Sequence, residues 1–260
     1  MFRPITRVAV IAANVFREVF RERALYLLGF YAVALLLASR LLPELSAGVT
    51  DRKILSDVGL AGMHILGLVL AVFVGTNLVN KEIEKRTLLV LMAKPVSRTE
   101  FLVGKHVGLS AVIAVLLAAM TAVYIMLMEA LKVSYSVKAT VVAVSFMGLL
   151  LSLMCAVAIG FGAMMSSLLA TLMTVAVYFV GTLSGDVVAL GKLTQNPTIE
   201  RMTQIFYLVV PDFSRLDLKN QAVYNILPSS DQLLQNAGYG LLYIVLVLTV
   251  SSLLFSAREF

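Results

Sequence analysis

Long apolar runs separated by shorter polar segments dominate the hydrophobic pattern of this 260-residue chain. Each run is about 20 residues long, which is the length an α-helix needs to cross a hydrocarbon layer about 30 Å thick. Six spans are predicted, at about 24–42, 58–79, 107–128, 139–163, 167–189 and 237–257. The pattern therefore predicts an all-α membrane protein, with one transmembrane domain over residues 1–260.

Residues 4–23 show a different pattern from the six spans. Apolar side chains recur at intervals of three and four from Val8 to Phe20, and charged side chains such as Arg7 and Arg17 lie largely on the other side. Pro4 fits the first turn of a helix, where its missing N–H costs nothing. The segment is predicted to be an amphipathic helix that lies in the membrane interface.

Small residues within the spans predict places where helices approach closely. Gly75 and Val79 flank a stretch that contains Thr76, and Gly160 and Gly162 lie in a later span. Small side chains let neighbouring membrane helices come into backbone contact. We expect a packing seam around Thr76.

The distribution of Lys and Arg predicts the orientation. Segments 1–23 and 80–106 and the C-terminus together carry twelve, whereas the connections on the opposite side carry eight over more residues. Cytoplasmic loops near the first spans are enriched in these residues. Both termini and the 80–106 loop are therefore predicted in the cytoplasm of a multi-pass protein of the cell (inner) membrane. Segment 190–236 is predicted outside, where its prolines and aromatics favour short interfacial or re-entrant helices.

Composition agrees with this assignment. The chain is 60% hydrophobic and 14% charged, against about 25% charged in soluble domains. The formal net charge of +6 is interpreted as Lys and Arg that hold cytoplasmic loops against anionic lipid headgroups. Membrane lipids, and not nucleic acid, are therefore the expected partners. The single cysteine, Cys155, allows no intrachain disulfide and is predicted to be a small buried residue.

The 80–106 loop is the richest in interpretable pattern. Glu82 and Arg86 are four residues apart with the acid first, an arrangement that supports a helix. Pro95 then ends that helix, because the residue before a proline is pushed out of the α region.

A second helix is predicted directly after this turn. Ser97 or Thr99 can cap a helix that begins near Glu100 and continues into the third span. The apolar run Leu88–Met92 would form an unexplained exposed patch on a merely solvated loop. The helix–turn–helix is therefore predicted to dock a soluble partner.

This loop resembles the coupling-helix region of type-2 ABC exporter permeases, closest to the branch that includes permeases of copper-enzyme maturation. Leu89 departs from the pattern, since many members carry an acid there. The matching positions, which the resemblance makes ATPase-coupling residues, are Glu82, Glu84, Arg86, Thr87, Pro95, Ser97, Arg98 and Glu100.

The resemblance implies the type-2 ABC exporter fold and a function. Two permease copies, identical or different, would pair and each would hold a cytoplasmic ATP-binding-cassette ATPase, which would bind ATP and Mg. The chain itself has no G-x-x-x-x-G-K-[ST] phosphate loop. It is therefore predicted to be neither an enzyme nor a cofactor-binding protein. Segment 206–224 resembles the outer loop of the family and is a candidate contact for an extracytoplasmic partner.

Three residues of the fifth span are candidates for a translocation path, namely Tyr178, Thr182 and Asp186. An ionisable residue inside a span is costly and is often functional. The alternative for Asp186 is a carboxylate at headgroup level, and the alternative for the hydroxyls is helix–helix hydrogen bonding.

No metal site is predicted. His64 lies in the second span without a second histidine nearby in sequence, and His106 lies at the cytoplasmic edge. Polar packing is the favoured interpretation of both. The twelve methionines could bind Cu(I) through their thioethers, but they form no compact motif.

Two other functions remain open from the sequence. A non-transporting scaffold that anchors an assembly complex would need the same docking loop. An ion-driven secondary transporter would need paired intramembrane carboxylates or broken helices.

Overall fold

The computed structural model describes residues 4–45, 51–84, 97–194 and 196–257, and its regular elements there are all helical. In chain order they are α1 (Pro4–Val19), the π-helical turn η1 (Phe20–Ala24), α2 (Leu25–Leu45), α3 (Asp51–Glu84), α5 (Arg98–Ala130), α6 (Val137–Met164), α7 (Ser167–Leu193), α8 (Pro197–Val209), the 3-10 turn η2 (Phe213–Arg215), α9 (Lys219–Val223) and α10 (Ser230–Ala257).

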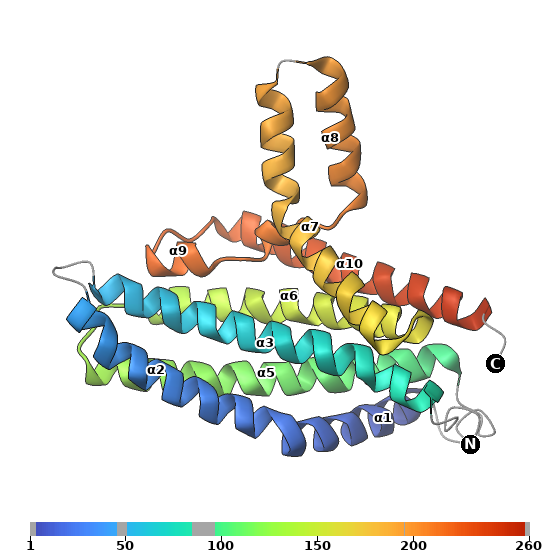
Figure 1. Ribbon diagram of the computed structural model, residues 1–260, viewed down its shortest axis with the longest axis horizontal. Helices are drawn as coiled ribbons and strands as arrows, with labels where there is room; N and C mark the ends of the chain where they lie inside the picture. The colour runs from blue at the N-terminus through green and yellow to red at the C-terminus, as the bar shows by residue number, and fades with distance from the viewer. Residues whose placement is uncertain (1–3, 46–50, 85–96, 195, 258–260) are drawn as a thin grey trace.

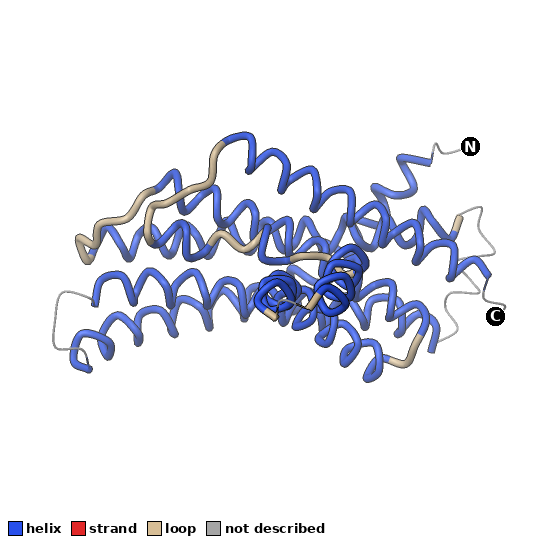
Figure 2. The backbone as a smooth tube through the Cα atoms, turned by 90° about the horizontal axis from the view of Figure 1, so that it is seen from above, coloured by secondary structure: helices blue, strands red, loops and turns tan. Residues whose placement is uncertain are grey.

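The centre of the molecule is a bundle of α3, α5 and α6, which run side by side along its longest dimension (Figures 1 and 2). Helix α10 packs on α6, and α2 packs on α3 and α5. Within the described residues, α3, α5, α6, α7 and α10 are long and apolar enough to cross a membrane, and the bent pair α1–α2 makes a sixth candidate. The predicted all-α architecture is confirmed.

The helices extend beyond the predicted spans. Helix α10 begins at Ser230 and α7 ends at Leu193, whereas the corresponding spans are predicted to begin at 237 and to end at 189. A run of apolar residues marks only the part of a helix that lies in the bilayer, and polar turns that continue the helix beyond it carry no apolar signal. The predicted spans are therefore shorter than the helices that contain them.

Glycines make close approaches between α3 and α6. A Cβ on Gly75 would lie 2.7 Å from the Cβ of Ala158, and one on Gly162 would lie 2.5 Å from the carbonyl oxygen of Thr76. Only a residue without a side chain permits such backbone contact. The predicted seam around Thr76 is confirmed.

Helix α1 is the amphipathic helix that the sequence predicts, but its apolar face packs against protein. Val15 and Val19 are buried. A Cβ on Gly104 of α5 would lie 2.8 Å from Ile11, and one on Gly108 would lie 2.7 Å from the backbone of α1. The bend between α1 and α2 is 44°. The position of α1 in the membrane interface stays a prediction.

Segment 190–236 is largely helical, as expected. In Figure 1 the first part of α7 lies along the bundle, whereas its last part and α8 stand away from it as a helical hairpin, which Figure 2 shows end-on. The turn η2 and helix α9 then lead back across the bundle to α10.

Both ends of the described chain lie at one end of the bundle. Helices α1, α5 and α7 begin there, and α3, α6 and α10 end there (Figure 1). The side of the membrane on which this end lies stays a prediction.

Candidate functional site

The first turn of α5 is closed by a reciprocal cap. The amide of Glu100 donates to the Ser97 Oγ at 3.1 Å, and the Ser97 amide donates to the Glu100 carboxylate at 2.9 Å. This capping box satisfies two amides that the helix leaves unpaired. Ser97 is confirmed as the cap, and the helix begins at Arg98, two residues before the predicted Glu100.

Arg98 joins the start of α5 to the end of α10. Its Nη1 donates to the carbonyl oxygens of Phe255 at 2.5 Å and of Ser256 at 3.1 Å. The neighbouring Thr99 hydroxyl lies 2.6 Å from the hydroxyl of Ser252. Because the last carbonyls of a helix lack partners and carry partial negative charge, a guanidinium there stabilises the helix end.

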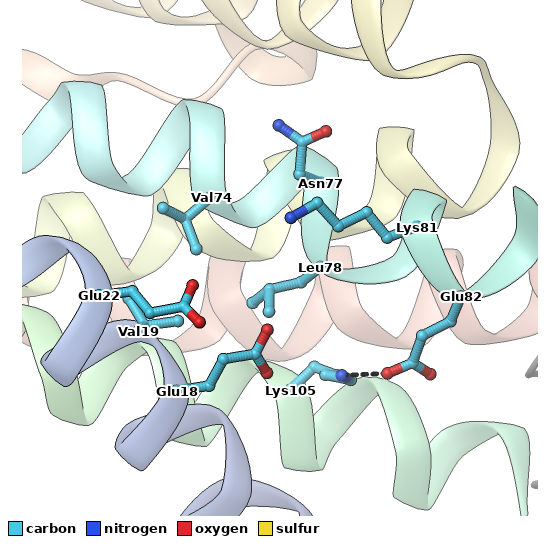
Figure 3. Close-up of a pocket in the computed structure, with 9 residues that line it drawn as sticks. All are labelled: Glu18, Val19, Glu22, Val74, Asn77, Leu78, Lys81, Glu82 and Lys105. Atoms are coloured by element: carbon cyan, nitrogen blue, oxygen red, sulfur yellow. Dashed lines mark hydrogen bonds and ion pairs between the residues drawn. The ribbon is translucent and has the colours of Figure 1, made fainter. Parts of the chain in front are cut away.

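Two ion pairs connect α5 to α1 and α3. Lys105 Nζ lies 2.5 Å from Glu82 Oε1, and the lysine side chain is only 8% exposed (Figure 3). On the other side, Arg7 of α1 lies 3.6 Å from the Glu100 carboxylate. A buried ion pair is costly to break, since the remaining charge loses its partner. The base of α5 therefore contacts α1, α3 and α10 together.

The other predicted coupling residues are not placed by the structure. The backbone of Glu84 ends α3, but its side chain lies outside the described part of the chain. Arg86, Thr87 and Pro95 also lie outside it, as does the predicted helix–turn–helix. Their coupling role stays a prediction.

A second polar cluster lies toward the opposite end. The imidazole of His64, which is 2% exposed, contacts Lys219 Nζ through Nδ1 and the Tyr178 hydroxyl through Nε2, both at 3.0 Å. Lys219 also lies 3.1 Å from Asp217. The ammonium has no acceptor site, so Nδ1 accepts and Nε2–H faces the tyrosine. His64 has the packing role that the sequence favours, but Lys219 and Asp217 carry no sequence signal for this contact.

The three candidates for a translocation path do not form one cluster. Tyr178 contacts His64, whereas the Thr182 hydroxyl donates to the Tyr178 carbonyl at 2.8 Å. Asp186 is exposed on α7. A role of Tyr178, Thr182 and Asp186 in translocation stays a prediction.

A group of hydrogen bonds centred on Asp212 holds η2 to α8 and α10. Its carboxylate accepts from the Tyr207 hydroxyl at 2.7 Å and from Arg215 Nε at 3.2 Å, and its amide donates to the Tyr239 hydroxyl at 2.7 Å. Burial, followed by the hydrogen bond to Asp212, raises the pKa of Tyr207 above its usual value. The phenol therefore stays a donor, and these hydrogen bonds fix where the α7–α8 hairpin leaves the bundle.

Histidine, cysteine and carboxylate side chains do not gather into a metal-binding set. Among the described residues, no group of three or more of them could hold a metal ion. His106 is instead satisfied by the Ser152 carbonyl oxygen at 3.0 Å.

The helical bundle and its apolar spans define a polytopic membrane protein. A family model described as "ABC-2 family transporter protein" matches residues 9–260, and the chain therefore belongs to this family of transporter permeases. No curated protein matches the chain. The resemblance to type-2 ABC permeases is confirmed at family level, and the copper-enzyme-maturation branch stays a prediction.

Proposed function

We propose that this chain is the permease half of an exporter whose separate ATP-binding-cassette ATPase binds ATP and Mg and grips segment 85–96. The observation that carries this proposal is the anchoring of both flanks of that segment. On one flank Glu82 of α3 is paired with Lys105 of α5, and on the other Arg98 is bonded to the end of α10.

Such anchoring would transmit force into the bundle. A push on the segment would reach α3 and α5 at once, because the ion pair couples their ends. Close-packed helices shift as bodies and do not deform continuously. The glycine seam at Gly162 and Thr76 would carry the shift from α3 to α6, and the permease would then open outward to release substrate.

The outer hairpin supports pairing with a second permease copy, identical or different. Leu190 and Leu193 on α7 and Met202 and Ile205 on α8 are each more than half exposed. Apolar side chains on a hairpin that stands away from the bundle need lipid or protein cover. The termini and segment 85–96 would face the cytoplasm, and segment 190–236 would face an extracytoplasmic partner.

A triple variant in the gripped segment tests the proposal. Glu84→Ala, Arg86→Ala and Pro95→Gly would be combined, and Arg98 would be left intact because it holds α10. The matched control combines Asp57→Ala, Arg40→Ala and Pro43→Gly, which are an acid, an arginine and a proline of α2 and α3 toward the other end of the bundle. Co-purification of the ATPase and substrate-stimulated ATP hydrolysis in proteoliposomes would be measured.

The triple variant should lose the ATPase or its stimulation, and the control should retain both. A triple variant that keeps complex and transport would disprove the coupling role. A complex whose ATP hydrolysis never responds to transport would favour a scaffold, and transport without any ATPase would favour an ion-driven carrier. The topology is tested with Ser97→Cys. Labelling of this cysteine by a membrane-impermeant thiol reagent in intact cells would disprove the cytoplasmic location of the segment.

A further inference from the structure

A small cavity with charges of both signs lies between α1–η1 and α3. Figure 3 shows the Glu18 and Glu22 carboxylates on one wall and the Lys81 ammonium on the other, directed into the same space. Asn77, Glu82 and Lys105 complete its polar lining. The cavity therefore adjoins the Glu82–Lys105 ion pair that joins α3 to α5.

Three of these charges are available to a ligand. Glu18, Glu22 and Lys81 are exposed, and none makes an ion pair within 4.0 Å with another residue that the structure describes. The cavity volume is about 70 Å³, and one water needs about 10–15 Å³ on the same measure. Its size suits a polar group of several atoms that carries both a cation and an anion.

An apolar strip on α3 leads into this cavity. Ile65, Val69 and Phe73 are 59%, 41% and 50% exposed, and they follow one another at intervals of four residues, so they lie on one face. The row continues to Asn77 and Lys81 in the cavity wall, and it winds around α3 as it does so, because four residues exceed one helical turn of about 3.6. In Figure 1 this helix lies between α2 and α7. Exposed apolar surface thus ends where the charged cavity begins. A phospholipid has the matching arrangement, since its apolar acyl chains end at a charged headgroup.

We propose that the cavity binds the headgroup of an amine-bearing phospholipid of the phosphatidylethanolamine type. Glu18 and Glu22 accept hydrogen bonds from the primary ammonium, Lys81 binds the phosphate, and an acyl chain lies along Ile65, Val69 and Phe73. A choline headgroup has no N–H to donate, so it cannot satisfy the two carboxylates. Binding does not depend on an ATPase partner, and a bound lipid would brace the junction of α1, α3 and α5.

Native mass spectrometry of the full chain, released from micelles with equal amounts of phosphatidylethanolamine and phosphatidylcholine, tests the proposal. The variants are Glu18→Gln with Glu22→Gln, and separately Lys81→Gln, each checked for a monodisperse size-exclusion profile. Glu200→Gln on α8 is the control, since it removes a partly buried acid far along the chain from the cavity. Soluble glycerophosphoethanolamine is added in a further arm to separate a lipid from its free headgroup.

The natural chain and Glu200→Gln should retain the ethanolamine lipid about tenfold better than the choline lipid, since charge-assisted hydrogen bonds are worth at least that ratio. The double glutamate variant should lose this preference, and Lys81→Gln should weaken retention of the ethanolamine lipid. Equal retention of the two lipids by the natural chain, or an unchanged preference in the double variant, would overturn the proposal. Displacement of the lipid by millimolar glycerophosphoethanolamine would show that the cavity binds the free headgroup compound and not specifically the lipid.

Discussion

The guanidinium of Arg98 lies 2.5 Å from the carbonyl oxygen of Phe255, so the first residue of α5 holds the last turn of α10. The two residues are 157 positions apart. Its charged centre also lies 5.6 Å from the Phe255 ring. The contact closes the bundle at the end where the predicted ATPase-binding segment begins and ends.

Replacing Arg98 should therefore loosen the end of α10. Arg98→Gln is expected to lower the free energy of unfolding by about 1–2 kcal/mol, since a charged donor to two helix-terminal carbonyls is lost. Arg98→Lys should recover part of this, because lysine keeps the charge without the fork of donors. Thermal unfolding in detergent measures the effect. Arg201→Gln, an exposed arginine of α8, is the control, and equal losses in both variants would refute the role of the contact.

The Glu82–Lys105 pair should behave as a coupled unit. Glu82→Lys and Lys105→Glu should each destabilise the protein by about 3 kcal/mol or more, because each leaves two like charges at a partly buried site. The double reversal should recover most of the loss, as a double-mutant cycle of stabilities or of transport rates would show. Additive losses in the double variant would mean that the two side chains act independently.

The seam between α3 and α6 should reject even one methyl group. Gly162→Ala would place a Cβ 2.5 Å from the Thr76 carbonyl oxygen. Backbone atoms cannot swing aside, so we expect a loss of about 1–3 kcal/mol by overpacking.

The matched control for this seam is Gly29→Ala, since a Cβ at Gly29 meets nothing within 4 Å. It should be neutral or slightly stabilising, because alanine favours a helix interior. Midpoints of thermal unfolding compare the two. An unchanged midpoint for Gly162→Ala would show that α3 and α6 are farther apart than described.

Lys219→Met should lower the local stability of α9. The ammonium that contacts both His64 and Asp217 is removed, while the apolar stem is kept. The amides of Ala222 and Tyr224, which bond within α9, should exchange with deuterium about fivefold faster as this segment opens. Lys192→Met, at an exposed lysine in the last turn of α7, should leave their exchange unchanged. Equal acceleration in both variants would rule out a specific contact with His64.

The parts of this architecture that were predictable are local in sequence. The apolar spans, the Ser97 cap and the close approach at Thr76 each depend on residues within a few turns of one helix. Arg98 shows the limit, because its pattern marks it for coupling but not for Phe255 of α10. Likewise, the amphipathic pattern of α1 shows that one face is apolar but not that Gly104 and Gly108 cover it.

The amino-acid sequence by itself determined which segments are apolar enough to span a membrane, where α5 begins to within two residues and which loop carries the family's motif. These properties follow from helix length, capping and residue spacing, which involve neighbours along the chain. Only the tertiary structure decided that Glu82 meets Lys105, that His64 meets Lys219 and that the α7–α8 hairpin stands away from the bundle. Those contacts depend on how each helix is rotated and shifted against the others, and many side-chain pairs distant in sequence are compatible with the same apolar pattern.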